Sequence, residues 1–194
     1  MDNNYLLSID YGTQSVRALV FDHHGQLISR IAHKVECYQS PHFGWAEQDS
    51  EYCWQQVCLV IQKLWQQTNI VPQQIRALAL TTQRNCVVHL DADNHPLRPI
   101  IMWPDSRRAN RYPHLSALWK IAFSVVGMTK RIEYFQGESE INWVSANQPE
   151  IADRSKKICF LSGYLNYRLS GELKDSVASQ VGYIPFDYKA RRWA

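Results

Sequence analysis

Hydrophobic and polar residues alternate along the first part of the chain, as they do in half-buried strands. The alternation predicts strands over residues 5–9, 16–21 and 26–31, and the short polar turns between them indicate an antiparallel meander. Further apolar runs of strand length occupy residues 75–80 and 86–90. We expect the run over 75–80 to be a buried strand that lies parallel to the first.

The alternation gives way to a helical period near residue 50. Apolar residues recur three and four positions apart between residues 54 and 65. Asp49 with Ser50 suits the start of this helix, because a short polar side chain can accept from the free backbone N–H groups there. Glu47, just before it, is expected to cap a turn.

The second half of the chain reads mainly as helix. Residues 106–123 have helical spacing, although Pro113 interrupts it, and residues 141–147 form a shorter helix. Residues 158–169 carry both strand and helix signals. Three strands, a helix and a further strand indicate a protein of the α/β class, with the carboxylate of Asp10 at the end of the first strand.

Composition adds little to this picture, but it excludes several classes of protein. The 194 residues suffice for one or two domains, and 45% hydrophobic with 20% charged residues is the balance of an ordinary globular protein. A net charge of +3 is too small to indicate a nucleic-acid partner. No apolar run approaches the ~20 residues of a membrane helix, and the N-terminus lacks a signal-peptide pattern. The five cysteines include no CxxC pair, which predicts reduced thiols in a cytoplasmic protein.

The segment that follows the first strand carries the most informative chemistry. Asp10 leaves a buried strand, and Gly12 allows a close approach of the backbone two residues later. Thr13, Gln14 and Ser15 add hydroxyl, amide and backbone N–H groups, which suit phosphate oxygens, while the carboxylate suits Mg²⁺. The segment is not a P-loop, because no lysine follows the glycine. A hairpin turn in which Asp10 caps its own backbone is the structural alternative.

Five short segments, taken in order, carry a resemblance to a known family. They occupy residues 10–17, 44–49, 82–85, 103–107 and 169–172. Together they resemble the N-terminal half of the FGGY carbohydrate kinases, the family of glycerol kinase, xylulokinase and ribulokinase. The resemblance implies the N-terminal lobe of a ribonuclease-H-like or actin-like ATPase fold, a mixed sheet with flanking helices. It implies one such domain over residues 1–194, incomplete at its C-terminal end, with the C-terminal lobe absent.

The same resemblance implies a reaction, the transfer of the γ-phosphoryl group of ATP to a hydroxyl of a sugar or polyol with Mg²⁺. Asp10 is then expected to hold the metal through water, and Arg17 to lie beside the transferring group. The ATP phosphates are expected to face the turn formed by Gly12, Thr13, Gln14 and Ser15. The implied partners are ATP and a small sugar or polyol, and a homodimer is also possible.

The resemblance also implies a set of sugar-binding residues: Gln83, Arg84, Asn85, Trp103, Asp105 and Arg107. Asn85 departs from the glutamate that glycerol kinase carries here, which weakens the case for glycerol. The Trp-x-Asp-x-Arg form that begins at Trp103 is similar to xylulokinase-like members and favours a pentulose. Core packing is the alternative for Trp103, and a surface pair at a helix N-terminus is the alternative for Asp105 and Arg107.

The general base of the family is expected beyond residue 194. Asp175 corresponds by resemblance to a different aspartate, for which a structural role is expected. The chain alone is therefore expected to be inactive, and a non-catalytic sugar-binding or regulatory lobe derived from a kinase is the alternative function. A ribonuclease-H-like nuclease is a third possibility, disfavoured because two metals need several converging carboxylates and only Asp10 is well placed.

Overall fold

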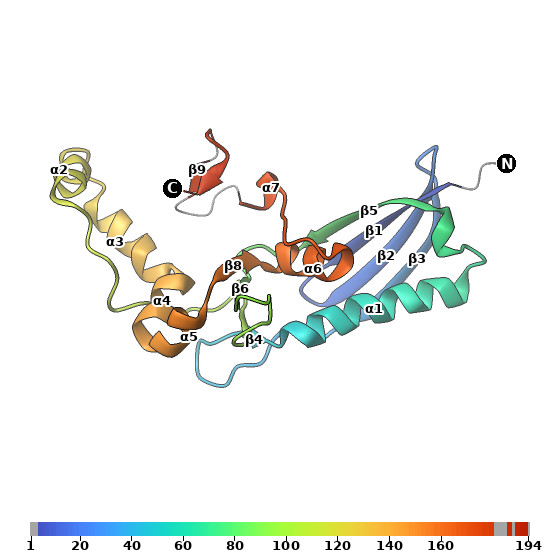
Figure 1. Cartoon of the computed structure of the whole chain (residues 1–194), viewed down its shortest axis with the longest axis horizontal. Helices are drawn as coiled ribbons and strands as arrows, with labels where there is room; N and C mark the ends of the chain where they lie inside the picture. The colour runs from blue at the N-terminus through green and yellow to red at the C-terminus, as the bar shows by residue number, and fades with distance from the viewer. Residues whose placement is uncertain (1–3, 181–185, 188, 194) are drawn as a thin grey trace.

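One mixed sheet is built from the N-terminal meander and a strand from later in the chain. The computed structural model describes residues 4–180, 186–187 and 189–193. The sheet has the order β3-β2-β1-β5, and its strands are β1 (Tyr5–Tyr11), β2 (Ser15–Asp22), β3 (Leu27–Lys34) and β5 (Ile75–Thr82). The first three pair antiparallel, and β5 pairs with β1 in parallel (Figure 1). The predicted meander and the predicted parallel strand are both confirmed.

Helix α1 (Ser50–Gln67) packs against one face of this sheet (Figure 1). Its start is as predicted, because Asp49 Oδ1 accepts from the backbone N–H of Tyr52 at 2.7 Å. The apolar residues of β1 and β2 meet the helix in one buried core, which includes Leu7, Ile9, Val16 and Ala18 together with Val57 and Leu64 of α1. Since side chains alternate along a strand, the residues between them, Asp10 and Arg17 among them, point to the opposite face.

A second, antiparallel sheet has the order β4-β7-β6-β8. Its strands are β4 (Glu47–Gln48), β7 (Ile100–Ile101), β6 (Val87–Leu90) and β8 (Lys157–Phe160). Strand β8 runs directly into helix α6 (Leu161–Ser170), which ends at Gly171 in the left-handed conformation. The mixed signals over residues 158–169 therefore come from two different elements that follow each other without a loop.

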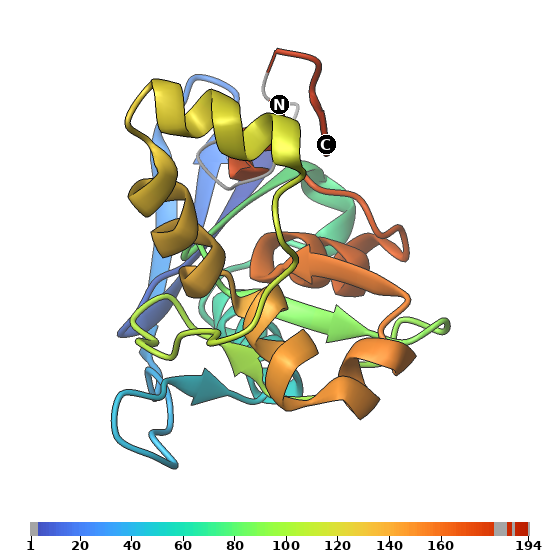
Figure 2. The same ribbon diagram turned by 90° about the vertical axis from the view of Figure 1, so that its left-hand side faces the viewer.

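A run of helices extends away from the two sheets (Figures 1 and 2). It consists of α2 (Ala117–Val125), α3 (Thr129–Glu138), α4 (Glu140–Asn147) and α5 (Pro149–Arg154). Helix α4 confirms the prediction over 141–147, whereas α3 and α5 were not predicted.

The helix predicted over residues 106–123 is wrong in its first half, because α2 begins only at residue 117. Residues before it donate their backbone N–H groups to distant segments instead of to a helical turn. Ser106 N–H bonds to the carbonyl of Gly44 at 2.8 Å, and Ala109 N–H bonds to that of Gly137 at 2.7 Å. Pro113 lacks an N–H altogether. Tertiary hydrogen bonds thus replace the helix that the apolar spacing favours.

Four shorter elements complete the described chain: the 3₁₀ turn η1 (Pro72–Gln74), helix α7 (Val177–Gln180) and the paired strands β9 (Phe186–Asp187) and β10 (Arg192–Trp193). The five cysteines are free thiols. Burial raises the pKa of Cys53, Cys86 and Cys159 to about 12, so these thiols stay protonated and weakly nucleophilic near neutral pH. Within the described residues, no helix is both long and apolar enough to cross a bilayer.

Candidate functional site

The carboxyl ends of β1 and β5 lie side by side and carry the residues that the sequence singled out first. Asp10 is the register partner of Arg17 on β2 and of Thr81 on β5. Arg17 Nη1 donates to Asp10 Oδ2 at 2.6 Å. Both side chains remain about one third exposed, at 33% for Asp10 and 38% for Arg17. This is an open ion pair on a rigid sheet, accessible to a solute.

The turn between β1 and β2 is closed by its own backbone. Gly12 N–H donates to the carbonyl of Ser15 at 3.0 Å. A Cβ atom on Gly12 would lie 3.2 Å from that carbonyl oxygen, a tight contact, so glycine suits the close approach of the two backbone segments in this turn. The carbonyl of Gln14 also accepts from Val35 N–H at 3.1 Å, which ties the turn to the end of β3.

Gln83, immediately after β5, joins the two strand ends. Its backbone N–H donates to the carbonyl of Tyr11 at 3.2 Å. Its side-chain Nε2 donates to the carbonyl of Gly12 at 3.2 Å, and its Oε1 accepts from Thr13 Oγ1 at 3.4 Å. The structure thus brings together two predicted groups of residues that are about seventy positions apart in the sequence. Both sides of the Gln83 amide are held by the turn.

Arg84 and Asn85 follow on the surface. Both are exposed, and Asn85 has a positive φ of 54°, a conformation that asparagine tolerates better than most residues. A hollow of about 230 Å³ adjoins the end of β5. Its polar lining comes from Thr81, Thr82, Gln83, Arg84, Ser162, Ser176 and Ser179. Hydroxyl and guanidinium groups of this kind can hydrogen-bond a small polyhydroxylated molecule.

The structure does not bring the second predicted group, Trp103, Asp105 and Arg107, to one open surface. Trp103 is 53% exposed. The side chains of Asp105 and Arg107 are 3% and 2% exposed, and they pair with each other. The proposed sugar contact of these two residues stays a prediction, which their enclosure does not favour. Glu47 is an ion-pair partner of Arg98 and Arg107 rather than a turn cap.

Asp175 takes part in local hydrogen bonds. Its Oδ2 accepts from Ser162 Oγ at 2.6 Å and from Gln180 Nε2 at 2.9 Å, and its Oδ1 accepts from the backbone N–H of Ser176 at 2.7 Å. Three donors on one carboxylate link α6 to the segment before α7. This arrangement supports the structural role that the sequence predicts for Asp175.

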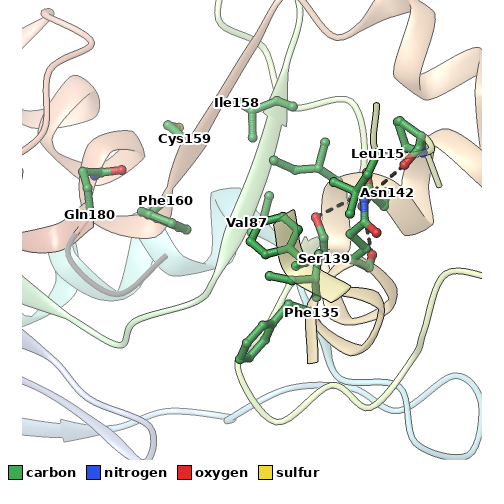
Figure 3. Close-up of a pocket in the computed structure, with 14 residues that line it drawn as sticks. Val87, Leu115, Phe135, Ser139, Asn142, Ile158, Cys159, Phe160 and Gln180 are labelled. Carbon is green, nitrogen blue, oxygen red and sulfur yellow. Dashed lines mark hydrogen bonds between the residues drawn. The ribbon is translucent and has the colours of Figure 1, made fainter. Parts of the chain in front are cut away.

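A larger hollow lies elsewhere and has a different character. It measures about 660 Å³, and its lining comes mainly from α3, α4 and β8. Figure 3 shows Phe135, Ser139 and Asn142 on one side and Cys159, Phe160 and Gln180 on the other. The side-chain amide of Asn142 is held by the carbonyl of Gln136 at 2.9 Å. None of the described residues that line this hollow is charged, so they supply no cation to pair with a phosphate group.

Sequence reasoning did not single out the serines that line the smaller hollow, nor Trp45, Trp143 and Arg98, which enclose the Asp105–Arg107 pair. The serines lie far along the chain from β5 and carry no motif. Trp45, Trp143 and Arg98 lie on separate elements. Of these three, only Trp45 lies in a segment, residues 44–49, that the family resemblance had picked out. Tertiary contacts alone identify these residues.

Comparisons with known proteins agree with this architecture. The family model described as FGGY family of carbohydrate kinases, N-terminal domain, matches residues 5–194. A xylulose kinase of Escherichia coli (strain K12) is 27% identical over 188 residues, which are 97% of this chain and 38% of that protein. A glycerol kinase of Rippkaea orientalis is 30% identical over 175 residues, which are 87% of this chain and 35% of that protein. The crystal structure of a gluconate kinase from Lactobacillus acidophilus superposes with a TM-score of 0.76 at 20% identity, covering 98% of this chain and 38% of that one. The chain thus spans less than two fifths of the length of these proteins.

Proposed function

Because the chain belongs to the FGGY family of carbohydrate kinases, we propose that it is the N-terminal part of a cytoplasmic, ATP-dependent kinase. Such an enzyme transfers the γ-phosphoryl group of ATP to a hydroxyl of a sugar or polyol, and we favour a pentulose over glycerol. The observation that carries the proposal is the junction of Asp10, the Gly12 turn and Gln83 at the ends of β1 and β5.

The donor set at this junction fits Mg²⁺. Arg17 occupies only Oδ2 of Asp10, and the carboxylate is one third exposed. The turn adds hydroxyl and carbonyl oxygens, and hard cations prefer oxygen ligands and keep several waters. Asp10 would therefore hold the ion through water. When bound, the ion neutralises charge on the phosphate oxygens.

Arg17 is proposed to act on the phosphoryl group itself. Its guanidinium lies beside the Gly12 backbone and is held in direction by Asp10, yet 38% of the side chain is exposed. A fixed positive charge at this point stabilises the negative charge that develops on the transferring oxygens. Thr13, Gln14 and Ser15 present the remaining donors of the turn to the phosphates.

The sugar is expected to bind next to this turn. Arg84 and Asn85 are exposed directly after Gln83, whose amide is bonded to the turn, so a sugar held there lies close to the phosphate-binding residues. Trp103 offers an exposed aromatic face to the C–H groups of the sugar. The general base is proposed to lie in the part of the kinase that the relatives carry beyond the region matched by this chain.

The test is a coupled assay of ADP release by the full kinase with pentuloses, hexuloses, gluconate, glycerol and alditols. Asp10→Asn is expected to lower kcat at least ~100-fold, because the metal-binding carboxylate is lost. The matched control is Asp22→Asn at the other end of β2, where the carboxylate only accepts from backbone N–H groups of its own turn. Equal activity in the two variants would exclude the role assigned to Asp10.

Asn85 stands where glycerol kinase carries a glutamate. Because of this departure, the non-catalytic alternative is tested as well. Calorimetric titration of this chain with the same sugars separates the two functions. Sugar affinity without any ADP release by the full protein would indicate a binding or regulatory lobe, whereas turnover that requires Asp10 supports the kinase.

A further inference from the structure

Trp103 is exposed although the residues just before it are not. Ile100 and Ile101 are fully buried and Met102 is 1% exposed, while Trp103 is 53% exposed. The backbone N–H of Asp105 donates to the carbonyl of Met102 at 3.0 Å, which closes a tight turn over residues 102–105. Trp103 therefore stands at the corner of a turn, and the direction of its indole depends on how that turn is fixed.

The loop over residues 44–47 holds the turn on both sides. Met102 N–H donates to the carbonyl of Ala46 at 2.9 Å, and Ala46 N–H donates back to Asp105 Oδ2 at 2.7 Å. Ser106 N–H donates to the carbonyl of Gly44 at 2.8 Å. Ser106 Oγ donates to the same carbonyl at 2.9 Å, so four hydrogen bonds attach a span of five residues to a single neighbouring loop.

The carboxylate of Asp105 is saturated by the protein itself. Its Oδ1 accepts from the backbone N–H of Arg107 at 2.9 Å and from Nε of Arg107 at 2.7 Å. Its Oδ2 accepts from Arg107 Nη2 at 2.6 Å and from Ala46 N–H. Two oxygens with four donors, in a side chain that is 3% exposed, leave no place for a sugar hydroxyl.

Arg107 is enclosed as completely. Its guanidinium lies 3.9 Å from the ring centre of Trp45 and 4.5 Å from that of Trp143 on α4. Nη1 lies 2.9 Å from Glu47 Oε1, and Glu47 also pairs with Arg98. A planar guanidinium that is bonded bidentately and packed against two indole rings, themselves in edge-to-face contact, can take few other orientations.

From this geometry we infer that Asp105 and Arg107 are positioning residues, which fix the Trp103 turn so that its indole forms one wall of the sugar site. That the indole of Trp103 contacts a sugar rests on the proposed function. That Asp105 and Arg107 fix the Trp103 turn does not depend on it. It assigns to the Trp-x-Asp-x-Arg segment one exposed contact residue and two enclosed supports.

The indole N–H signals of the seven tryptophans in a ¹H–¹⁵N spectrum provide the readout. The Trp103 signal is the one that Trp103→Phe removes. Arg107→Lys and Asp105→Asn are each expected to shift or broaden that signal in the ligand-free chain, because neither replacement preserves the bidentate pair. Unchanged signals of Trp54 and Trp65, both in α1, show that each variant is folded.

Arg108→Lys is the matched control, the same substitution at the next residue. Arg108 lies 3.9 Å over the ring of Tyr134 with its side chain 40% exposed, and it bonds to the carbonyl of Tyr134 and pairs with Glu138. It is expected to leave the Trp103 signal in place. A Trp103 signal that is unmoved in both Arg107→Lys and Asp105→Asn overturns the inference.

Titration with xylulose, gluconate and glycerol in the presence of Mg²⁺ and ADP, which has no γ-phosphoryl group to transfer, then tests the link to the sugar. Arg107→Lys is expected to raise the Kd about tenfold, the loss of roughly one aromatic contact. Trp103→Ala is expected to do the same, and the double variant should be little worse than Trp103→Ala alone, because the two residues act through one contact. If the increases in Kd of the two single variants multiply in the double variant, Arg107 contacts the sugar independently of Trp103.

The two proposals fail in different ways. If no sugar moves the Trp103 signal of the unmodified chain at any concentration, the proposed sugar site is wrong, and the ligand-free spectra still decide the positioning. If sugars bind, but the ligand-free Trp103 signal is the same in Arg107→Lys and Asp105→Asn as in the unmodified chain, the positioning role is wrong and the proposed function stands.

Discussion

Two aspartate–arginine pairs in this chain have the same chemistry and opposite surroundings. Asp10–Arg17 is about one third exposed and is joined by one hydrogen bond of 2.6 Å. Asp105–Arg107 is almost completely enclosed and is joined by bidentate contacts, with two tryptophan rings on the guanidinium. The open pair is accessible to a ligand, whereas both carboxylate oxygens of the enclosed pair already accept hydrogen bonds from the protein.

The difference shows that a motif of charged residues does not by itself identify a binding site. Both pairs lie in segments that resemble the same family, and both were expected to contact ligands. Burial separates them, because a buried ion pair must be fully satisfied by the protein, while an exposed one exchanges partners easily. The three predictions that follow test this contrast, beginning with the largest expected effect.

Loss of the enclosed arginine should be the most damaging change. Arg107→Met leaves the carboxylates of Asp105 and Glu47 buried with fewer partners, and we expect the free energy of unfolding to fall by about 3–5 kcal/mol. Arg17→Met, the same substitution in the open pair, should cost less than about 1 kcal/mol. Urea unfolding of both variants measures the difference, and equal losses would contradict the contrast.

The enclosed region should also make stability depend on pH, through His89. This histidine is 2% exposed, and its Nδ1 lies 3.0 Å from Ser155 Oγ. Burial, assisted by the positive charge of Arg98, lowers the pKa of His89 from 6.5 to about 4. Between these values the unfolded chain binds a proton that the folded chain does not, so the free energy of unfolding falls as the pH falls.

The loss should approach about 3 kcal/mol between pH 6.5 and pH 4. Urea unfolding across this range measures it, with His89→Gln as the control, because glutamine has no titrating group. For each protein the free energy of unfolding is plotted against pH. The slope for the original chain minus the slope for His89→Gln gives the contribution of His89. Parallel curves for the two proteins would show that His89 is protonated in the folded state as readily as in the unfolded one.

Salt should produce the smallest effect and should act only on the open pair. At ~1 M NaCl the Debye length falls to about 3 Å, so the already small difference between the original chain and Arg17→Met should shrink toward zero. The penalty for Arg107→Met should persist, because solvent ions do not reach that pair. Thermal unfolding at low and high salt compares the variants, and a salt-sensitive penalty at Arg107 would mean that the enclosure is incomplete.

Much of the fold could be predicted because the early strands and α1 follow regular apolar periods. The predictions failed where distant segments compete for the backbone, as at Ser106 and Ala109, whose N–H groups bond to Gly44 and Gly137. The turn between β1 and β2 was predictable, since Asp10 and Gly12 are close in sequence; that it faces phosphates stays a prediction. The enclosure of Arg107 was not, because its indole neighbours, Trp45 and Trp143, lie on separate elements and no local pattern indicates that they meet.

The bridge made by Gln83 has a consequence for the order in which the chain folds. Asp10 and Arg17 meet within one hairpin, but Gln83 reaches Gly12 across 71 positions and only after α1 has crossed between the strands. Contacts so far apart in sequence form slowly. We expect pulsed hydrogen exchange to show early protection in β1 and β2 and late protection at the backbone N–H of Gln83. A nascent chain would then carry the carboxylate–arginine pair and the turn beside it before Gln83 is bonded to that turn, and would gain the Gln83 bridge in the step that completes the sheet.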